Sequence, residues 1–167
     1  MKRVVSLIVM FVWAITLFAQ VEPIQFNKYG NTISGYRPGN KARIMLGVFS
    51  EAENKAYTEI NILRFMANVN EWRIDNVGED YYTISTHTGL YLTVQGSAVE
   101  HAKLIIDHPK RTDAQIWRIV PANDGTYYLL SKMNERLLVT VVGPFVYLEE
   151  LKIDSDKFIQ EWTIKRE

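Results

Sequence analysis

A tryptophan recurs in this chain at a constant spacing, each time inside a similar short segment. Trp72, Trp117 and Trp162 stand 45 residues apart, and an isoleucine follows each of them two positions later. Self-similarity at a fixed period is typical of a repeated structural unit. The sequence therefore predicts a fold built from three copies of one unit, with these tryptophans as the structural core of the repeats.

Within each unit the sequence has the pattern of short strands. Apolar and polar residues alternate in short runs, and Gly, Asn, Asp or Pro separates one run from the next. This pattern is typical of all-β sandwiches and barrels. We predict strands over residues 81–85, 90–95, 103–107 and 115–120 in the second repeat, over 127–131, 137–141, 150–153 and 160–164 in the third, and over 31–34, 44–48 and 59–65 ahead of Trp72 in the first.

The first repeat carries an extra segment between its strands. Residues 50–56 have a helix-forming composition, and Ser50 with Glu53 forms a candidate capping box. We expect a short helix inserted in a loop. A longer helix over residues 50–65 is the competing interpretation.

The number of repeats selects the architecture. Units of four strands at this period also describe the blades of a propeller, but a propeller needs at least about four blades. Three units instead predict an all-β fold of the β-trefoil type, a closed assembly of three four-stranded repeats with pseudo-threefold symmetry. We expect one domain over residues 20–167, with repeats at approximately 26–76, 77–122 and 123–167.

The first residues have the layout of a secretory signal peptide. Lys2 and Arg3 give a positive start, residues 4–18 are almost wholly apolar, and Ala19 is a small residue at their end. A membrane anchor is the alternative, but an apolar run of about 15 residues is shorter than the roughly 20 that span a bilayer. We therefore expect a signal peptide over residues 1–19, no membrane span after its removal, and a secreted protein, extracellular or, in a Gram-negative source, periplasmic.

The charge balance and the absence of cysteine argue against a nucleic-acid partner and exclude disulfide bonds. The chain has 19 basic and 19 acidic residues, and removing Lys2 and Arg3 leaves a small acidic excess. This balance argues against nucleic acid as a partner, because phosphate binding needs a concentrated basic face. The sequence contains no cysteine, so the core must hold the exported chain without disulfides.

The tryptophan segments carry a resemblance to a known family. Gln115-Ile116-Trp117 and Gln160-Glu161-Trp162 resemble the Gln-x-Trp repeat of the ricin B-type lectins, and Asn70-Glu71-Trp72 departs from it at its first residue. The Tyr-Tyr segments that begin at residues 81 and 127 resemble the cysteine-free branch of that superfamily. The resemblance extends over essentially the whole mature chain and implies the β-trefoil fold.

The resemblance also implies a shallow sugar pocket on each repeat. In such a pocket a carboxylate on the second strand and a later Asn bind sugar hydroxyls, while an aromatic ring stacks on the sugar. Pockets of this kind act together through avidity. In this chain the carboxylate positions hold Gly47, Thr93 and Thr140, and the Asn positions hold Val69, Ala114 and Ile159. Only the glutamines of the second and third repeats match.

The candidate site residues fall in the second and third repeats. We expect Gln115 and Gln160 to hold backbone groups more than a ligand. Phe145 and Tyr147 follow a Gly-Pro turn and form a candidate stacking surface, with packing against the barrel rim as the alternative. Asp113 is a further polar candidate for a pocket in the second repeat. The carbohydrate-binding candidates are Thr93, Asp107, His108, Gln115, Thr140, Tyr147 and Gln160.

No motif for catalysis or for a cofactor is present. The only imidazoles are His87, His101 and His108, and the sequence has neither a His-Glu-x-x-His nor a Gly-x-Ser-x-Gly motif. His101 with Asp107 and His108 matches no established metal spacing, so a solvated loop is the expected role. We expect no enzyme activity, no cofactor and no metal.

Two functions follow from these observations. The first is a secreted carbohydrate-binding module of weak or altered specificity, whose partner is a carbohydrate or glycoconjugate. The second is a protein-binding trefoil, such as a protease inhibitor or surface-interaction protein, whose loops contact a protein partner. The Gln-x-Trp repeats favour the first function, which is the one we expect. The lost sugar-contact positions and the segment from Ser50 to Thr58 motivate the second function as the alternative.

Overall fold

The computed structural model describes residues 24–26, 28–36, 43–48, 58–59, 61–63, 71–143, 145–152 and 158–166. Within these ranges the regular structure is almost all strand. The strands are β1 (Asn31–Tyr36), β2 (Arg43–Gly47), β3 (Thr58–Glu59), β4 (Asn61–Leu63), β5 (Glu71–Gly78), β6 (Tyr81–Ser85), β7 (Tyr91–Val94), β8 (Leu104–Asp107), β9 (Trp117–Pro121), β10 (Tyr127–Ser131), β11 (Asn134–Val142), β12 (Phe145–Glu150), β13 (Phe158–Ile159) and β14 (Thr163–Arg166). A short 3-10 helix, η1 (Asp113–Gln115), precedes β9. None of the helical structure in these ranges is long and apolar enough to cross a membrane.

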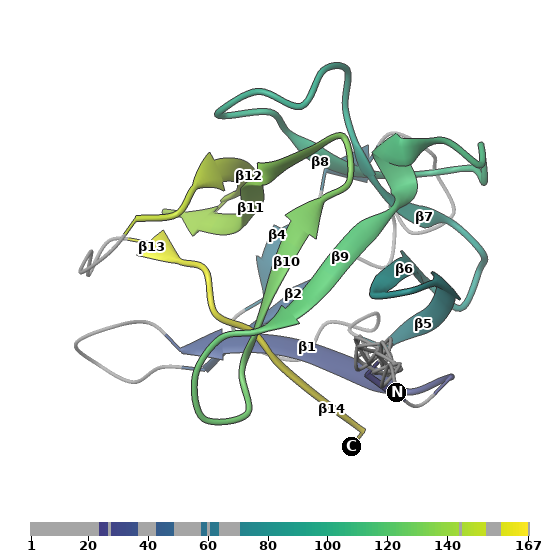
Figure 1. Ribbon diagram of the computed structural model, residues 1–167, viewed down its shortest axis with the longest axis horizontal. Coiled ribbons are helices and arrows are strands. Elements are labelled where there is room, and N and C mark those ends of the chain that lie inside the picture. Colours follow the sequence, from purple (N-terminus) through teal and green to yellow (C-terminus); the bar gives the residue numbers. More distant parts are fainter. Residues whose placement is uncertain are drawn as a thin grey trace, which may run out of the picture.

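Six strands form a closed barrel. Antiparallel pairing runs from β14 to β1, β5, β6, β9 and β10. The ring closes between β10 and the residue just before β14, where Tyr127 and Trp162 exchange two backbone hydrogen bonds of 2.8 and 2.9 Å. The first and last barrel strands therefore lie side by side, as the ribbon shows (Figure 1).

Three hairpins cover one end of the barrel. They are β2 with β4, β7 with β8, and β11 with β12. Neighbouring hairpins are joined by short pairings, between Phe145 and Asn61, between Lys103 and Tyr147, and between β3 and β8. Each third of the chain thus supplies two barrel strands and one hairpin, which is the β-trefoil arrangement, and the predicted fold class is confirmed.

The three tryptophans make the same contact in each repeat. All are buried, and each indole nitrogen donates a hydrogen bond to a backbone carbonyl on the second strand of its own repeat. Trp72 reaches Leu46 (3.0 Å), Trp117 reaches Leu92 (3.1 Å) and Trp162 reaches Val139 (3.0 Å). Because a buried indole N–H needs a partner, these bonds fix each hairpin on the barrel core.

The structure corrects two predicted elements. The third strand of the third repeat was predicted over residues 150–153, but β12 runs from Phe145 to Glu150. Val146 and Leu148 are the buried members of its alternation, and Gly143 takes the positive φ of 64° that the preceding turn requires. The longer helix over residues 50–65 is wrong for residues 58–59 and 61–63, which are strands.

Several predictions concern residues outside the described ranges. These are the signal peptide over residues 1–19, the short helix over 50–56 and the proposed protein-contact role of the segment up to Thr58. The repeat boundaries also stay predictions.

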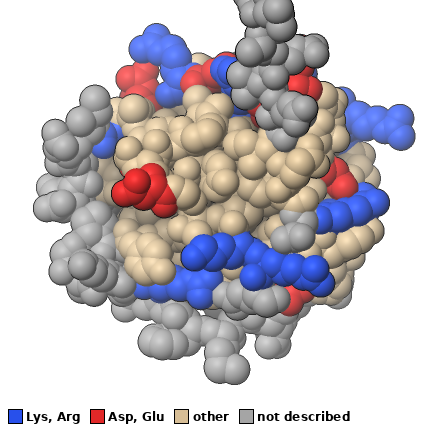
Figure 2. Space-filling model, turned by 60° about the horizontal axis from the view of Figure 1, so that its bottom comes forward, with Lys and Arg blue, Asp and Glu red and all other residues tan. Residues whose placement is uncertain are grey.

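On the face shown in Figure 2, Lys and Arg side chains gather along one margin of a broad area that carries little charge.

Aromatic rings pack where the chain enters the barrel. Phe26 meets the rings of Tyr82 and Tyr127 edge to face, each at 5.4 Å between centroids. The Tyr82 hydroxyl donates a 2.9 Å hydrogen bond to the carbonyl of Ile24. This cluster ties the segment ahead of β1 to the barrel.

The Tyr82 phenol makes the free energy of unfolding decrease at alkaline pH. Burial raises the pKa of Tyr82 above its ordinary value of 10.0. The folded state therefore favours the protonated form, so this contribution is complete below pH 10 and is lost as the pH rises through the folded-state pKa. We expect Tyr82→Phe to cost about 1 kcal/mol at pH 7 through the lost hydrogen bond. Urea titrations should show a shallower alkaline decline of the unfolding free energy for Tyr82→Phe than for the wild type, and parallel declines would contradict this.

Candidate functional site

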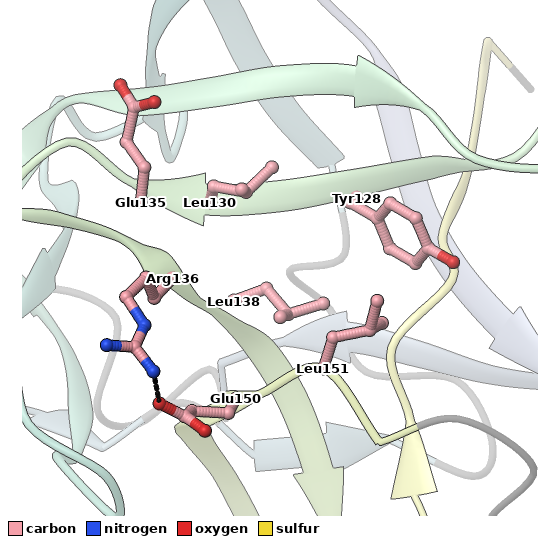
Figure 3. A pocket seen from close by; sticks show the side chains of 7 residues that line it. All are labelled: Tyr128, Leu130, Glu135, Arg136, Leu138, Glu150 and Leu151. Carbon is pink, nitrogen blue, oxygen red and sulfur yellow. Dashed lines mark hydrogen bonds and ion pairs between the residues drawn. The ribbon is translucent and has the colours of Figure 1, made fainter.

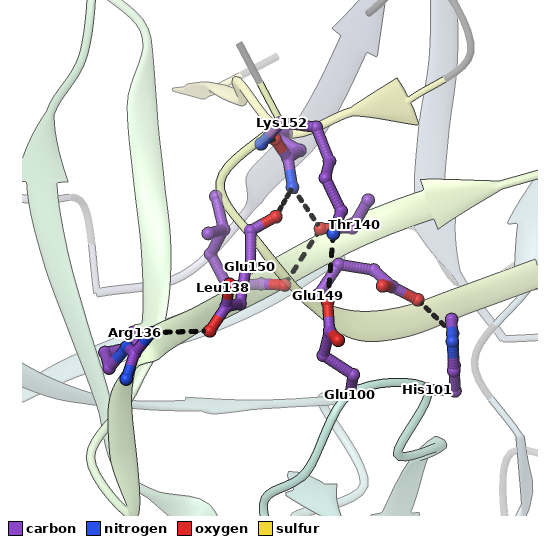
Figure 4. Close-up of polar contacts among 9 residues, drawn as sticks. Glu100, His101, Arg136, Leu138, Thr140, Glu149, Glu150 and Lys152 are labelled. Atoms are coloured by element: carbon purple, nitrogen blue, oxygen red, sulfur yellow. Dashed lines mark hydrogen bonds and ion pairs between the residues drawn. The ribbon is translucent and has the colours of Figure 1, made fainter.

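A buried polar network holds the base of the third hairpin (Figure 4). The side-chain amide nitrogen of Gln160 donates to Thr140 Oγ1 (2.9 Å) and to the carbonyl of Glu150 (2.9 Å). Its amide oxygen accepts the backbone N–H of Lys152 (2.8 Å). Both amide hydrogens are used, so Gln160 has no side-chain donor left for a ligand.

The second repeat contains the same network. Gln115 donates to Thr93 Oγ1 (3.1 Å) and to the carbonyl of His108 (2.7 Å), and it accepts the backbone N–H of Lys110 (2.7 Å). The structure thus brings together three of the candidate binding residues, Thr93, His108 and Gln115. Their contacts are those of a structural brace that joins the hairpin to the loop before β9.

The two threonines of these networks also face inward. Thr93 and Thr140 are buried, and each hydroxyl donates to the carbonyl two residues earlier, at 2.7 and 2.9 Å. Each hydroxyl oxygen also accepts a hydrogen bond from the side-chain amide of the glutamine in its own repeat. These positions correspond to the carboxylates of the pocket that the resemblance implied, so a direct carboxylate contact from the second strand is missing in both repeats.

A buried carboxylate stands at equivalent register in each of the two hairpins. Asp107 pairs across the strands with Tyr91, and Glu149 pairs with Leu138. Asp107 accepts the backbone N–H of His108 (2.8 Å) and forms an ion pair with Lys110 Nζ (2.5 Å). Because buried carboxylates need such partners, the Asp107 carboxylate serves its own loop rather than a ligand.

Glu149 is a polar residue that the sequence analysis missed. Its carboxylate is buried and lies 2.6 Å from Nδ1 of His101, which belongs to the loop of the second repeat. In that loop Glu100 also contacts Lys152 Nζ (2.9 Å). This hydrogen bond lowers the pKa of Glu100 and raises the pKa of Lys152. The loop of the second repeat is therefore fastened to the third hairpin.

On the third hairpin two aromatic rings of one strand, Phe145 and Tyr147, lie in contact. Phe145 is 43% exposed and Tyr147 is half-buried, with ring centroids 6.1 Å apart and planes tilted by 52°. Tyr147 lies opposite Thr140 in the ladder. In the second repeat the equivalent positions hold Lys103 and Ile105. We call Phe145 and Tyr147 the hairpin face; it offers an apolar ring surface to a flat ligand.

The histidines do not gather with other ligating groups. Within the described ranges no group of three or more His, Asp or Glu side chains is placed to hold a metal ion. His101 contacts Glu149, whereas Asp107 contacts Lys110. The side chains of His87 and His108 are exposed, and the side chain of Asp113 forms an ion pair with Lys132 (3.1 Å).

The structure also shows a groove that the sequence analysis did not predict (Figure 3). It has a volume of about 350 Å³ and lies between β10 and the base of the β11–β12 hairpin. Its lining residues are Tyr128, Leu130, Glu135, Arg136, Leu138, Glu150 and Leu151. None of them is among the seven predicted binding residues. The sequence signal that could have found the groove is the alternation in β10. Leu129 is buried there, so its neighbours Tyr128 and Leu130 point to the opposite face of the strand.

Known proteins share both sequence and fold features with this chain. Residues 68–143 match the ricin-type beta-trefoil lectin domain-like family. The designed threefold-symmetric protein ThreeFoil is similar with a TM-score of 0.70 and 21% identity, over 83% of this chain and 98% of that chain. No curated protein matches the sequence.

Two natural proteins extend the comparison. The Polyporus squamosus lectin is similar with a TM-score of 0.66 and 24% identity over 85% of this chain, which spans about half (50%) of that lectin. The Haemophilus ducreyi cytolethal distending toxin is similar with a TM-score of 0.61 and 16% identity, over 82% of this chain and 83% of that one. The chain is thus a cysteine-free β-trefoil whose residues 68–143 match the ricin-type beta-trefoil lectin domain-like family.

Proposed function

We propose that this protein is a carbohydrate-binding module without enzyme activity, exported by its N-terminal segment. The match of residues 68–143 to the ricin-type lectin domain carries this proposal. The structure of the Polyporus squamosus lectin, which shares the fold, is described as bound to the epitope Neu5Acα2-6Galβ1-4GlcNAc. The exposed ring of Phe145 and the half-buried ring of Tyr147 supply the stacking surface that sugar recognition needs.

The contacts of the third repeat support weak or altered specificity. The residue opposite Tyr147 is Thr140, whose hydroxyl is engaged by Leu138 and Gln160. A sugar on the hairpin face would therefore gain stacking energy without a directional bond from a second-strand carboxylate. Stacking alone contributes about 0.5–1.5 kcal/mol, so avidity from several copies of a glycan would matter more than one tight contact.

Removing the Tyr147 ring tests the proposal. A glycan array with the mature protein should identify a saccharide, and Tyr147→Ala should then weaken its binding by about threefold to tenfold in calorimetry, as expected from a lost ring contact. Tyr36→Ala is the matched control, because Tyr36 is 55% exposed on β1, outside the third hairpin, and should leave the affinity unchanged. A wild-type protein that binds no glycan at millimolar concentration would overturn the proposed function.

A further inference from the structure

The groove beside β10 differs from the hairpin face in position and chemistry. It lies at the base of the third hairpin, where Leu137 and Glu150 form the last pair of the ladder, whereas Phe145 and Val142 form the pair at the tip. The groove and the hairpin face share no residue. Its volume of about 350 Å³ is at the small end of the range for small-molecule sites.

The middle of the groove is apolar. Leu130, Leu138 and Leu151 line it together with the ring of Tyr128 (Figure 3). Leu151 is 47% exposed, so an occupant could cover surface that water now contacts. Covering apolar surface is favourable by about 25 cal/mol per Å². The groove therefore favours an occupant with an apolar substituent.

Polar groups stand at the edges of this apolar surface. Arg136 Nη2 forms a 2.9 Å ion pair with Glu150. The Glu135 carboxylate accepts a hydrogen bond from the Tyr81 hydroxyl and another, of 2.9 Å, from Arg118 Nη1. These contacts hold the carboxylates in fixed positions, where they can accept hydrogen bonds from hydroxyl or amide groups of a ligand.

We propose that the groove is a second saccharide subsite, specific for a sugar that carries a methyl group, either a 6-deoxyhexose or an N-acetylhexosamine. The methyl group would lie on the leucines, while a sugar hydroxyl or the acetamido N–H donates a hydrogen bond to the Glu150 carboxylate and a sugar oxygen accepts one from Arg136. A hydroxymethyl group in the same place would leave a hydroxyl without a partner, which is costly in an apolar site. This inference rests on the proposed function, because it assigns one sugar class to a second position on the same module.

Matched sugar pairs test the subsite. L-Fucose and L-galactose differ only in a methyl against a hydroxymethyl group, and N-acetylglucosamine differs from glucose by its acetamido group. Each sugar is titrated into the mature protein, and at least one methyl-bearing sugar should shift the backbone amide NMR signals of Leu138 and Leu151. The matched sugar without the methyl group, L-galactose or glucose, should bind about tenfold more weakly. Leu151→Ser should remove this preference. Val99→Ser is the control, because Val99 is also exposed (58%) but lies in another loop.

The outcomes separate this inference from the proposed function. A methyl-bearing sugar whose affinity is the same in wild type and Leu151→Ser would overturn the groove assignment. Sugar binding that depends on Tyr147 and is indifferent to Leu151 would leave the proposed function standing and refute the subsite. The subsite would also be refuted if no sugar shifted the amide signals of the groove residues and a leucine-containing peptide did shift them. Equal melting temperatures of the variants would show that Leu151→Ser remains folded.

Discussion

Trp117→Ala is expected to lower the free energy of unfolding by about 3–5 kcal/mol, the range measured for deleting a large buried ring. The Trp117 side chain is fully buried in the core cluster. Its loss would leave a cavity and would also deprive the Leu92 carbonyl of its 3.1 Å indole donor. Urea denaturation followed by circular dichroism would measure the change.

Two further variants keep this prediction testable if Trp117→Ala does not fold. Trp117→Phe retains a ring but loses the N–H, so we expect a smaller loss of about 1–3 kcal/mol from the unpaired Leu92 carbonyl and the reduced packing. Val77→Ala, at an exposed position of β5, should change stability by less than about 0.5 kcal/mol. If Trp117→Ala were as stable as Val77→Ala, the indole would not be a core element of the trefoil.

Gln160→Glu should destabilise the third hairpin by about 3 kcal/mol at neutral pH, although the two side chains have nearly the same shape. Glutamate can still accept the Lys152 N–H, but it cannot donate to Thr140 Oγ1 or to the Glu150 carbonyl. It would place a negative charge against that carbonyl oxygen in a position where Gln160 is 6% exposed.

The pH dependence identifies the cause of this loss. Burial beside acceptors would raise the pKa of the introduced carboxyl, so the deficit should shrink as the pH falls and the carboxyl becomes protonated. Gln95→Glu is the matched control, because Gln95 is exposed at the end of the second hairpin and the same substitution there should have little effect. A deficit that stays constant on acidification would point to a cause other than the buried charge.

The architecture could be predicted because the repeats impose the same physical demand three times. The alternation Gln-x-Trp-x-Ile places a large ring and a branched side chain on one face, and three such faces can be buried together only around a common centre. Most strands were predicted within a few residues of their observed bounds. The start of β12 was missed because Pro144 was interpreted as a break, whereas the buried Val146 and Leu148 continue the strand.

The site was less predictable because its chemistry depends on which side chains the fold brings together, within one repeat or between two. Thr140, Glu150 and Gln160 are distant in sequence, and only the folded hairpin shows that their polar atoms satisfy one another. Glu149 gave no indication of its buried position, because His101, its partner, comes from the preceding repeat. The groove likewise forms between β10 and the hairpin, so no single segment of sequence contains it.

The pairing of β1 with β14 has a consequence for how the protein acquires its fold. Asn31 lies opposite Arg166, and Ser34 lies opposite Thr163, so contacts that join the two ends of the described chain are part of the barrel wall. Contacts of such high sequence separation slow folding. During synthesis the ring can become complete only after the last strand has left the ribosome, and until then the first strand lacks its neighbour and exposes an edge on which chaperones or other chains can act.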